Sequence, residues 1–115
     1  MIPANLPFAK TRNINGFVFV SGEVPFGEDG SIPYGLEAQT DLTFARIAKS
    51  LSTEGLTLDD IVSVTVYLTD PKDFQEFNAA YAKHFKGPLP TRTTVCAQLM
   101  IDARVELTVI AAART

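Results

Sequence analysis

Two oppositely charged residues in the last quarter of the chain, Arg92 and Glu106, are the strongest candidates for chemistry in this sequence. Arg92 stands at the start of one predicted strand, and Glu106 lies in the otherwise apolar run from Val105 to Ala112. A charge in an apolar strand is costly unless it is paired or used. Both residues could belong to a structural ion pair or a solvated edge. Alternatively, they could form a small anion site, in which the planar guanidinium binds a carboxylate and Glu106 moves a proton beside it.

Two further polar residues stand where structure alone does not require them. Ser21 precedes Gly22 at the end of a predicted strand, and its hydroxyl could face a ligand or satisfy the strand end. Asn78 lies in the middle of a predicted helix, where asparagine is not favoured by propensity. Its side chain could hold a loop or line a pocket.

The elements that position these residues are predicted from hydrophobic periodicity and from turn signals. The last two strands are separated by a short segment, so we expect them to form an antiparallel hairpin. The predicted strands are Lys10 to Ile14, Phe17 to Val20, Ile61 to Leu68, Thr91 to Gln98 and Arg104 to Ala112.

Two helices are predicted between these strands. The first covers Leu36 to Glu54 and stops at Gly55. The second begins with a cap at Asp70 and Pro71 in its first turn, and it ends at Gly87-Pro88. Aromatic residues of the second helix recur at spacings of three and four and predict a buried stripe: Phe74, Phe77, Tyr81 and Phe85.

This order of elements predicts one α+β domain over residues 1–115, with two helices on one face of a mixed sheet. Two helices cover only one face. Yet the strands at Phe17 to Val20 and Val105 to Ala112 are apolar on both sides. A monomer would expose a larger apolar patch than soluble monomers usually tolerate, so we expect a homo-oligomer.

Composition narrows the function. The net charge of -3 argues against binding to nucleic acid. No apolar run is long enough to span a membrane, and the first residues do not resemble a signal peptide, so a cytoplasmic location is expected. One cysteine and one histidine cannot supply a conventional metal site. Cys96 is expected to be a buried small hydrophobe rather than a nucleophile.

Several segments share their order and spacing with a known family, and together they cover nearly the whole chain. They are Leu6-Pro7-Phe8, Phe19 to Pro25, Gln39 to Leu51, Gly55-Leu56, Asp60-Ile61-Val62, Thr65 to Leu68, Asp73-Phe74, Phe77-Asn78, Tyr81 to Phe85, Pro90 to Val95 and Val105-Glu106-Leu107. On these segments the chain resembles the reactive-intermediate deaminase family of the RidA type, also called the L-PSP endoribonuclease or translation inhibitor family.

The resemblance implies a chorismate-mutase-like, two-layer fold of the bacillus type, assembled as a homotrimer with ligand sites between subunits. It also implies hydrolysis of 2-aminoacrylate and related enamines or imines to 2-keto acids and ammonia, without a cofactor. Matched residue by residue, Arg92 would bind the substrate carboxylate and Glu106 would act as acid and base. Asn78 and Ser21 would line the pocket, together with Phe8 and Thr94, which stand where members usually carry tyrosine and cysteine.

Three functions follow from these observations. The first is deamination of a short 2-imino acid, with Arg92 as carboxylate ligand and Glu106 as proton shuttle. The second is a non-catalytic trimer that binds small carboxylate metabolites, which Phe8 and Thr94 favour. The third is the ribonuclease activity of the family's older name, which the negative charge and the single histidine, His84, disfavour.

Overall fold

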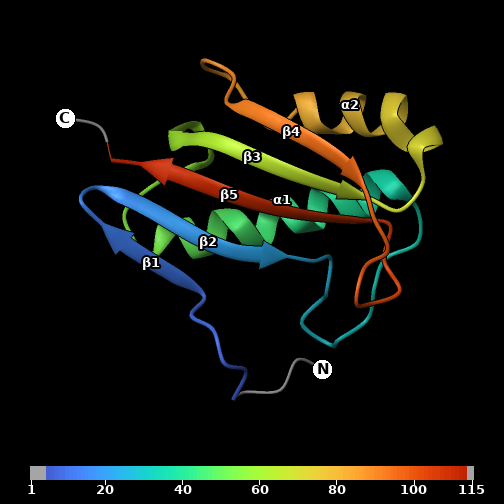
Figure 1. Ribbon diagram of the computed structural model, residues 1–115, viewed down its shortest axis with the longest axis horizontal. Helices are drawn as coiled ribbons and strands as arrows, with labels where there is room; N and C mark the ends of the chain where they lie inside the picture. The colour runs from blue at the N-terminus through green and yellow to red at the C-terminus, as the bar shows by residue number, and fades with distance from the viewer. Residues whose placement is uncertain (1–4, 114–115) are drawn as a thin grey trace.

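Five strands form one mixed sheet in the computed structural model, which describes residues 5–113. Their order across the sheet is β1-β2-β5-β3-β4, and only the β3–β4 pair is parallel. In Figure 1 the last strand of the chain, β5, lies between β2 and β3. The strands are β1 Thr11–Ile14, β2 Phe17–Glu23, β3 Ile61–Leu68, β4 Thr91–Cys96 and β5 Val105–Ala112.

Two α-helices cover one face of this sheet, which confirms the predicted α+β architecture. Helix α1 spans Leu36–Ser52 and passes behind the strands in Figure 1, whereas α2 spans Phe74–Ala82 and lies beside β4. Short 3-10 turns, η1 (Leu58–Asp60) and η2 (Pro71–Asp73), precede β3 and α2. None of the helices in the described part of the chain is long and apolar enough to cross a membrane.

The start of the second helix was predicted correctly, but its end was not. The Asp70 carboxylate accepts a hydrogen bond from the backbone N–H of Lys72 at 2.9 Å, and Pro71 opens the first turn. The helix ends at Ala82 rather than at Gly87-Pro88. Its aromatic stripe is only partly buried, since Phe77 and Tyr81 are in the core but Phe74 is 45% exposed.

The predicted hairpin of the last two strands is wrong. β4 pairs with β3 in parallel, so β3, η2–α2 and β4 form a crossover unit. The chain then crosses β3 through residues 97–104, and β5 inserts between β2 and β3. The reason is packing: alternate residues of β5 are buried from Val105 to Ala111, as in a central strand, whereas β4 is exposed along one edge.

β2 continues beyond the predicted stop at Ser21-Gly22 and ends at Glu23. An irregularity in its pairing with β5 lies between Val20 and Glu23. Glu23 is 2% exposed because it turns to the helix side, where its carboxylate binds Lys10 Nζ and Arg46 Nε, each at 2.7 Å. A buried carboxylate is tolerable there because two cations pair with it.

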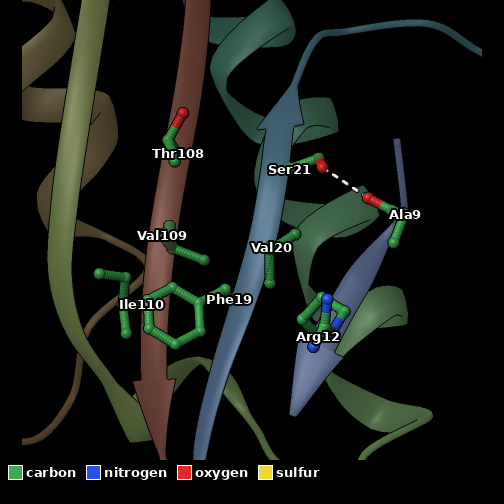
Figure 2. Close-up of a pocket in the computed structure, with 8 residues that line it drawn as sticks. All are labelled: Ala9, Arg12, Phe19, Val20, Ser21, Thr108, Val109 and Ile110. Atoms are coloured by element: carbon green, nitrogen blue, oxygen red, sulfur yellow. Dashed lines mark hydrogen bonds between the residues drawn. The ribbon is translucent and has the colours of Figure 1, made fainter. Parts of the chain in front are cut away.

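The face of the sheet away from the helices is apolar and exposed, as the sequence predicts. Phe17 and Phe19 of β2 are 46% and 45% exposed, while Val18 and Val20 between them are in the core. Figure 2 shows Phe19 beside Ile110 of β5 on this face, at the side of a shallow hollow. We call this surface the open face; what covers it stays a prediction.

Candidate functional site

Arg92 lies on the helix side of β4 and is held by two polar side chains. Its register partner in β3 is Val64, a core residue beneath the helices, which places the arginine on that face. Arg92 Nε donates to Thr94 Oγ1 at 2.8 Å, and Nη2 donates to Asn78 Oδ1 at 2.6 Å. Three residues singled out in the sequence therefore meet here, and we call Arg92, Asn78 and Thr94 the arginine cluster.

Three aromatic rings of α2 lie against this guanidinium, and we call them the aromatic bed. Arg92 Cζ lies 5.7 Å from the ring centre of Phe74, 5.3 Å from that of Phe77 and 4.8 Å from that of Tyr81. Such cation–π contacts are each worth about 0.5–2 kcal/mol. The aromatic stripe was visible in the sequence but was interpreted only as core. Burial raises the pKa of the Tyr81 phenol, and the nearby Arg92 charge acts in the opposite direction.

Glu106 lies on the other side of the sheet. Its register partner is Tyr67 of β3, and both of its neighbours in β5, Val105 and Leu107, are buried toward the helices. Burial raises the pKa of the Glu106 carboxyl, and the negative charge of Glu23 adds to this effect. The protonated form of Glu106 is therefore more populated than that of an ordinary glutamate.

Gly22 leaves the space that the Glu106 carboxylate occupies. A Cβ atom at position 22 would collide with Glu106 Oε2 and lie 3.5 Å from Thr108 Oγ1. The glycine is thus required by the close approach of the Glu106 side chain, which its place at a strand end suggested only in general terms. We call Glu106, Gly22 and Ser21 the glutamate cluster.

Ser21 of this second cluster contacts the segment that precedes β1. Ser21 Oγ donates to the backbone carbonyl of Ala9 at 2.6 Å, which Figure 2 shows beside β1. This contact satisfies the strand end, one of the two roles predicted for the residue. Phe8, the residue before Ala9, is 61% exposed.

The two clusters lie on opposite faces of the sheet, and β3 separates the strands that carry them. Among the described residues, no ion pair joins Arg92 to Glu106. A small molecule bound to the arginine cluster cannot reach Glu106 of the same chain.

The cysteine and the histidine of the sequence also have clear places in the structure. Cys96 is exposed, not buried, because β4 is an edge strand and the thiol lies at its end. His84 follows α2, where its ring nitrogen lies 2.8 Å from Asp41 Oδ1 and its ring stacks on Phe44 at 4.3 Å. This histidine belongs to neither cluster.

Comparisons with known proteins agree over nearly the whole chain. The sequence pattern of a family described as Endoribonuclease L-PSP matches residues 2–113. A RutC family protein of Saccharolobus solfataricus is 37% identical over 108 residues, which are 91% of this chain and 86% of the relative. Protein MMF1, mitochondrial, of Saccharomyces cerevisiae is 36% identical over 111 residues, 95% of this chain and 77% of the relative.

Solved structures show the same fold. The crystal structure of yeast Mmf1 superposes with a TM-score of 0.89 at 34% identity, covering 97% of this chain and 91% of that one. The structure of Escherichia coli TdcF with bound serine gives a TM-score of 0.89 at 29% identity, with coverage of 96% and 91%.

Proposed function

This chain belongs to the Endoribonuclease L-PSP family, and on that premise we propose that it hydrolyses reactive 2-imino acids and 2-enamines, such as 2-aminoacrylate, to 2-keto acids and ammonia. One observation carries the proposal. The Arg92 guanidinium is held by Thr94 and Asn78 on one face of the sheet, and the Glu106 carboxyl group, whose pKa is raised, lies on the other. If two copies bring them together, the guanidinium can bind the carboxylate of the substrate and the carboxyl group can transfer protons, which are the two roles that imine hydrolysis needs.

The arginine cluster supplies the binding half. Hydrogen bonds to Thr94 and Asn78 use Nε and one hydrogen of Nη2, whereas Nη1 has no hydrogen-bond partner among the described residues. The outer edge of the guanidinium, Nη1 with Nη2, can therefore bind both oxygens of a carboxylate. Because the aromatic bed and the two polar contacts fix the plane of the group, little rotational freedom is lost when a ligand binds.

Glu106 supplies the proton transfers. Hydrolysis begins when water adds to the C=N carbon and a proton reaches the nitrogen, which gives a carbinolamine. Its hydroxyl then loses a proton while the protonated amine leaves as ammonia, so that the C–N bond breaks and the C=O bond forms. A carboxyl group with a raised pKa can serve both steps, because its protonated form gives a proton and its ionised form takes one.

A second copy of the chain is needed to bring the halves together. The open face is an exposed apolar surface that contains the glutamate cluster. Covering it with the arginine side of another copy would bury this surface and complete the site. We place this function in a homotrimer with the chorismate-mutase-like arrangement and treat Ser21, Phe8, Asn78 and Thr94 as substrate-binding residues. The cytoplasmic location stays a prediction, since the yeast relative is named as mitochondrial.

The endoribonuclease activity in the family description fits the two clusters less well than imine hydrolysis does. His84 is held by Asp41 and by the Phe44 ring, away from both clusters. Non-catalytic binding of small carboxylates is the nearer rival, since Phe8 offers no hydroxyl and the bound serine in the TdcF structure shows that protein holding an amino acid.

Mixing two inactive variants tests the composite site directly. Imino acids are generated by an amino-acid oxidase, and their loss is followed by semicarbazide trapping. We expect Arg92→Ala and Glu106→Gln each to lose about 10²–10⁴-fold in rate. When the two variants are unfolded together and refolded as mixed oligomers, one site in four pairs an intact Arg92 with an intact Glu106. Activity should then return to about one quarter of the wild-type value.

Each alternative predicts a different outcome. A site built within one chain would give no recovery on mixing. A wild-type protein that leaves the trapping rate unchanged but binds 2-ketobutyrate in calorimetry would be a metabolite-binding protein, and deamination would be rejected.

A further inference from the structure

One extra residue in β2 decides on which face of the sheet Glu23 lies. Val20 pairs with Val109 of β5. Glu23, three residues further along β2, pairs with Leu107, which is only two residues away from Val109, so β2 contains a β-bulge. In a regular strand Glu23 would follow Phe19 onto the open face, because side chains alternate with a period of two. The bulge turns Glu23 to the helix side instead, where it is buried.

Contacts from two other segments hold this bulge in place. The Glu23 carboxylate accepts hydrogen bonds from Lys10 Nζ and Arg46 Nε, each at 2.7 Å. Arg46 Nη1 also donates to the carbonyl of Phe26 at 2.7 Å. The backbone N–H of Ser21 donates to the carbonyl of Lys10 at 3.0 Å. The bulge is thus attached to α1 through Arg46 and to the segment before β1 through Lys10, and we call Lys10, Glu23 and Arg46 the ion triad.

The bulge and Glu106 meet at Gly22. This glycine precedes Glu23 in the chain, and a Cβ atom on it would collide with Glu106 Oε2. The Glu106 carboxyl therefore packs directly against the backbone of the bulge. Because the ion triad fixes that backbone one residue away, it also fixes the surface against which Glu106 lies.

The ion triad also places a negative charge across the backbone from Glu106. Glu23 pairs with Leu107, the neighbour of Glu106 in β5. Burial raises the pKa of the Glu106 carboxyl, and the charge of Glu23 raises it further. Two other titratable or charged side chains belong to strands on this side of the sheet: Tyr67, the register partner of Glu106, and Arg12, which Figure 2 shows on β1. Of the charges, that of Glu23 is the one that shifts this pKa.

Unequal exposure explains why the two cations do not cancel the charge of Glu23. The side chain of Glu23 is 3% exposed, whereas those of Lys10 and Arg46 are 55% and 24% exposed. Lys49 lines the same hollow beside α1 and is also exposed. Water and salt screen exposed charges more strongly than buried ones, so the carboxylate dominates the field inside the sheet.

We propose that the residues of the ion triad are positioning residues for Glu106: they fix the bulge of β2 against it and hold a negative charge behind it, which sets the pH range in which it transfers protons. This inference rests on the proposed function, because it takes Glu106 as the proton-transfer group. It adds that the acid–base behaviour of Glu106 is controlled from the helix side of the sheet, by residues that do not face the open face.

Two variants that change the charge of the ion triad in opposite directions test this proposal. Glu23→Gln removes the negative charge but keeps an oxygen that can accept a hydrogen bond. The limb of the kcat–pH profile that follows Glu106 should therefore move down by about 0.5 pH unit or more. Lys10→Met removes the more exposed cation, so the same limb should move up. Glu28→Gln and Lys86→Met make the same changes in net charge at exposed positions and should leave the profile where it is.

The direction of the two shifts distinguishes tuning from a merely structural role. A triad that only stabilises the fold would lower the melting temperature in both variants without moving either profile, and that result would overturn the proposal. Shifts of the same sign in Glu23→Gln and Lys10→Met would also overturn it, because opposite charges must act in opposite directions. Lys10 is half-exposed, so Lys10→Met carries the test if Glu23→Gln does not fold.

NMR titration separates the ion triad from the reaction. The ¹³C signal of the Glu106 carboxyl, assigned by its loss in Glu106→Gln, reports the pKa of this group without any turnover. A lower pKa in Glu23→Gln, in a protein that leaves imino acids untouched, would retain the role of the triad and reject the proposed reaction. Equal pKa values of Glu106 in Glu23→Gln and in the wild type would reject the triad and leave the deaminase proposal standing.

Discussion

The two clusters differ in how far a single chain completes them. The arginine cluster is finished by its own chain, since a crossover unit brings Arg92 and Thr94 of β4 to Asn78 and the aromatic bed of α2. The glutamate cluster is left unfinished. Glu106 is half-buried on an apolar face. The charge that affects its pKa is that of another carboxylate, Glu23, and it raises the pKa further.

This difference teaches which features a fold can prepare in advance. The Arg92 cation is stabilised within its own chain by the aromatic rings of α2 and by the Asn78 side-chain oxygen. The ionised form of a carboxyl group is destabilised by the same kind of burial, so its pKa rises. In the proposed function, the rigid arginine cluster binds the substrate and Glu106 transfers protons.

The largest effect is expected when the arginine cluster is disrupted. Arg92→Ala should weaken the binding of 2-keto acids by about 10²–10³-fold in calorimetry, because it removes the charge and the fork and leaves Asn78 unpaired. Arg92→Lys keeps the charge but not the fork, and we expect a smaller loss of about 10-fold or more. Lys72→Ala, which removes an exposed cation just before α2, is the matched control and should bind as the wild type does. Equal affinity of Arg92→Lys and the wild type would show that the fork is not used.

A smaller effect is expected from disturbing the unfinished cluster. Gly22→Ala places a methyl group where the Glu106 carboxylate lies, so the carboxylate must move. We expect kcat to fall about 10-fold while keto acid affinity stays near the wild-type value, because the arginine cluster is untouched. Gly87→Ala is the control, since a Cβ there meets nothing closer than Asp59 Oδ1 at 4.0 Å. A loss of affinity without a loss of kcat would contradict the separation of roles.

The smallest effect concerns stability and its dependence on pH. The raised pKa of Glu106 means that the folded state holds this proton more tightly than the unfolded state does. Its contribution to the free energy of unfolding is therefore present below the ordinary glutamate pKa and is lost as pH rises through the raised value. Glu106→Gln should be more stable than the wild type near neutral pH, with the advantage shrinking toward about pH 4.

Urea unfolding at several pH values measures this difference. Glu28→Gln removes an exposed loop carboxylate and serves as the control for net charge. A Glu106→Gln variant whose advantage grows toward acidic pH would show that the carboxylate is stabilised in the folded state, against the direction inferred from its burial.

Much of the fold could be predicted from the sequence because each element carries a local signal. The alternation in β3 and β5, the cap at Asp70 and the glycine after α1 each predicted an element that the structure contains. The pairing of β4 could not be predicted in this way. Short loops favour hairpins, but which strand is central depends on burial across the whole sheet, and β5 is the more apolar of the two.

The candidate site residues could be picked out from the sequence, but their arrangement in space could not. Arg92 and Glu106 stood out because charges in apolar strands are rare, and Asn78 because asparagine is unusual within a helix. Their distribution over two faces depends on register and on the position of β3, which local patterns do not encode. The spacing of the aromatic residues predicts a buried position for Phe74, because it indicates a helix face but not what that face contacts; in the structure the ring lies against Arg92.

The central position of β5 also constrains how the molecule is made. The pairs β1–β2 and β3–β4 lie on either side of it and do not contact each other through the sheet. On the ribosome, both pairs emerge before the strand that joins them, and each then presents an unpaired edge to its surroundings. Before Val105 and the rest of β5 are available, the two half-sheets have no ladder between them, so β5 is the strand that joins them into one sheet.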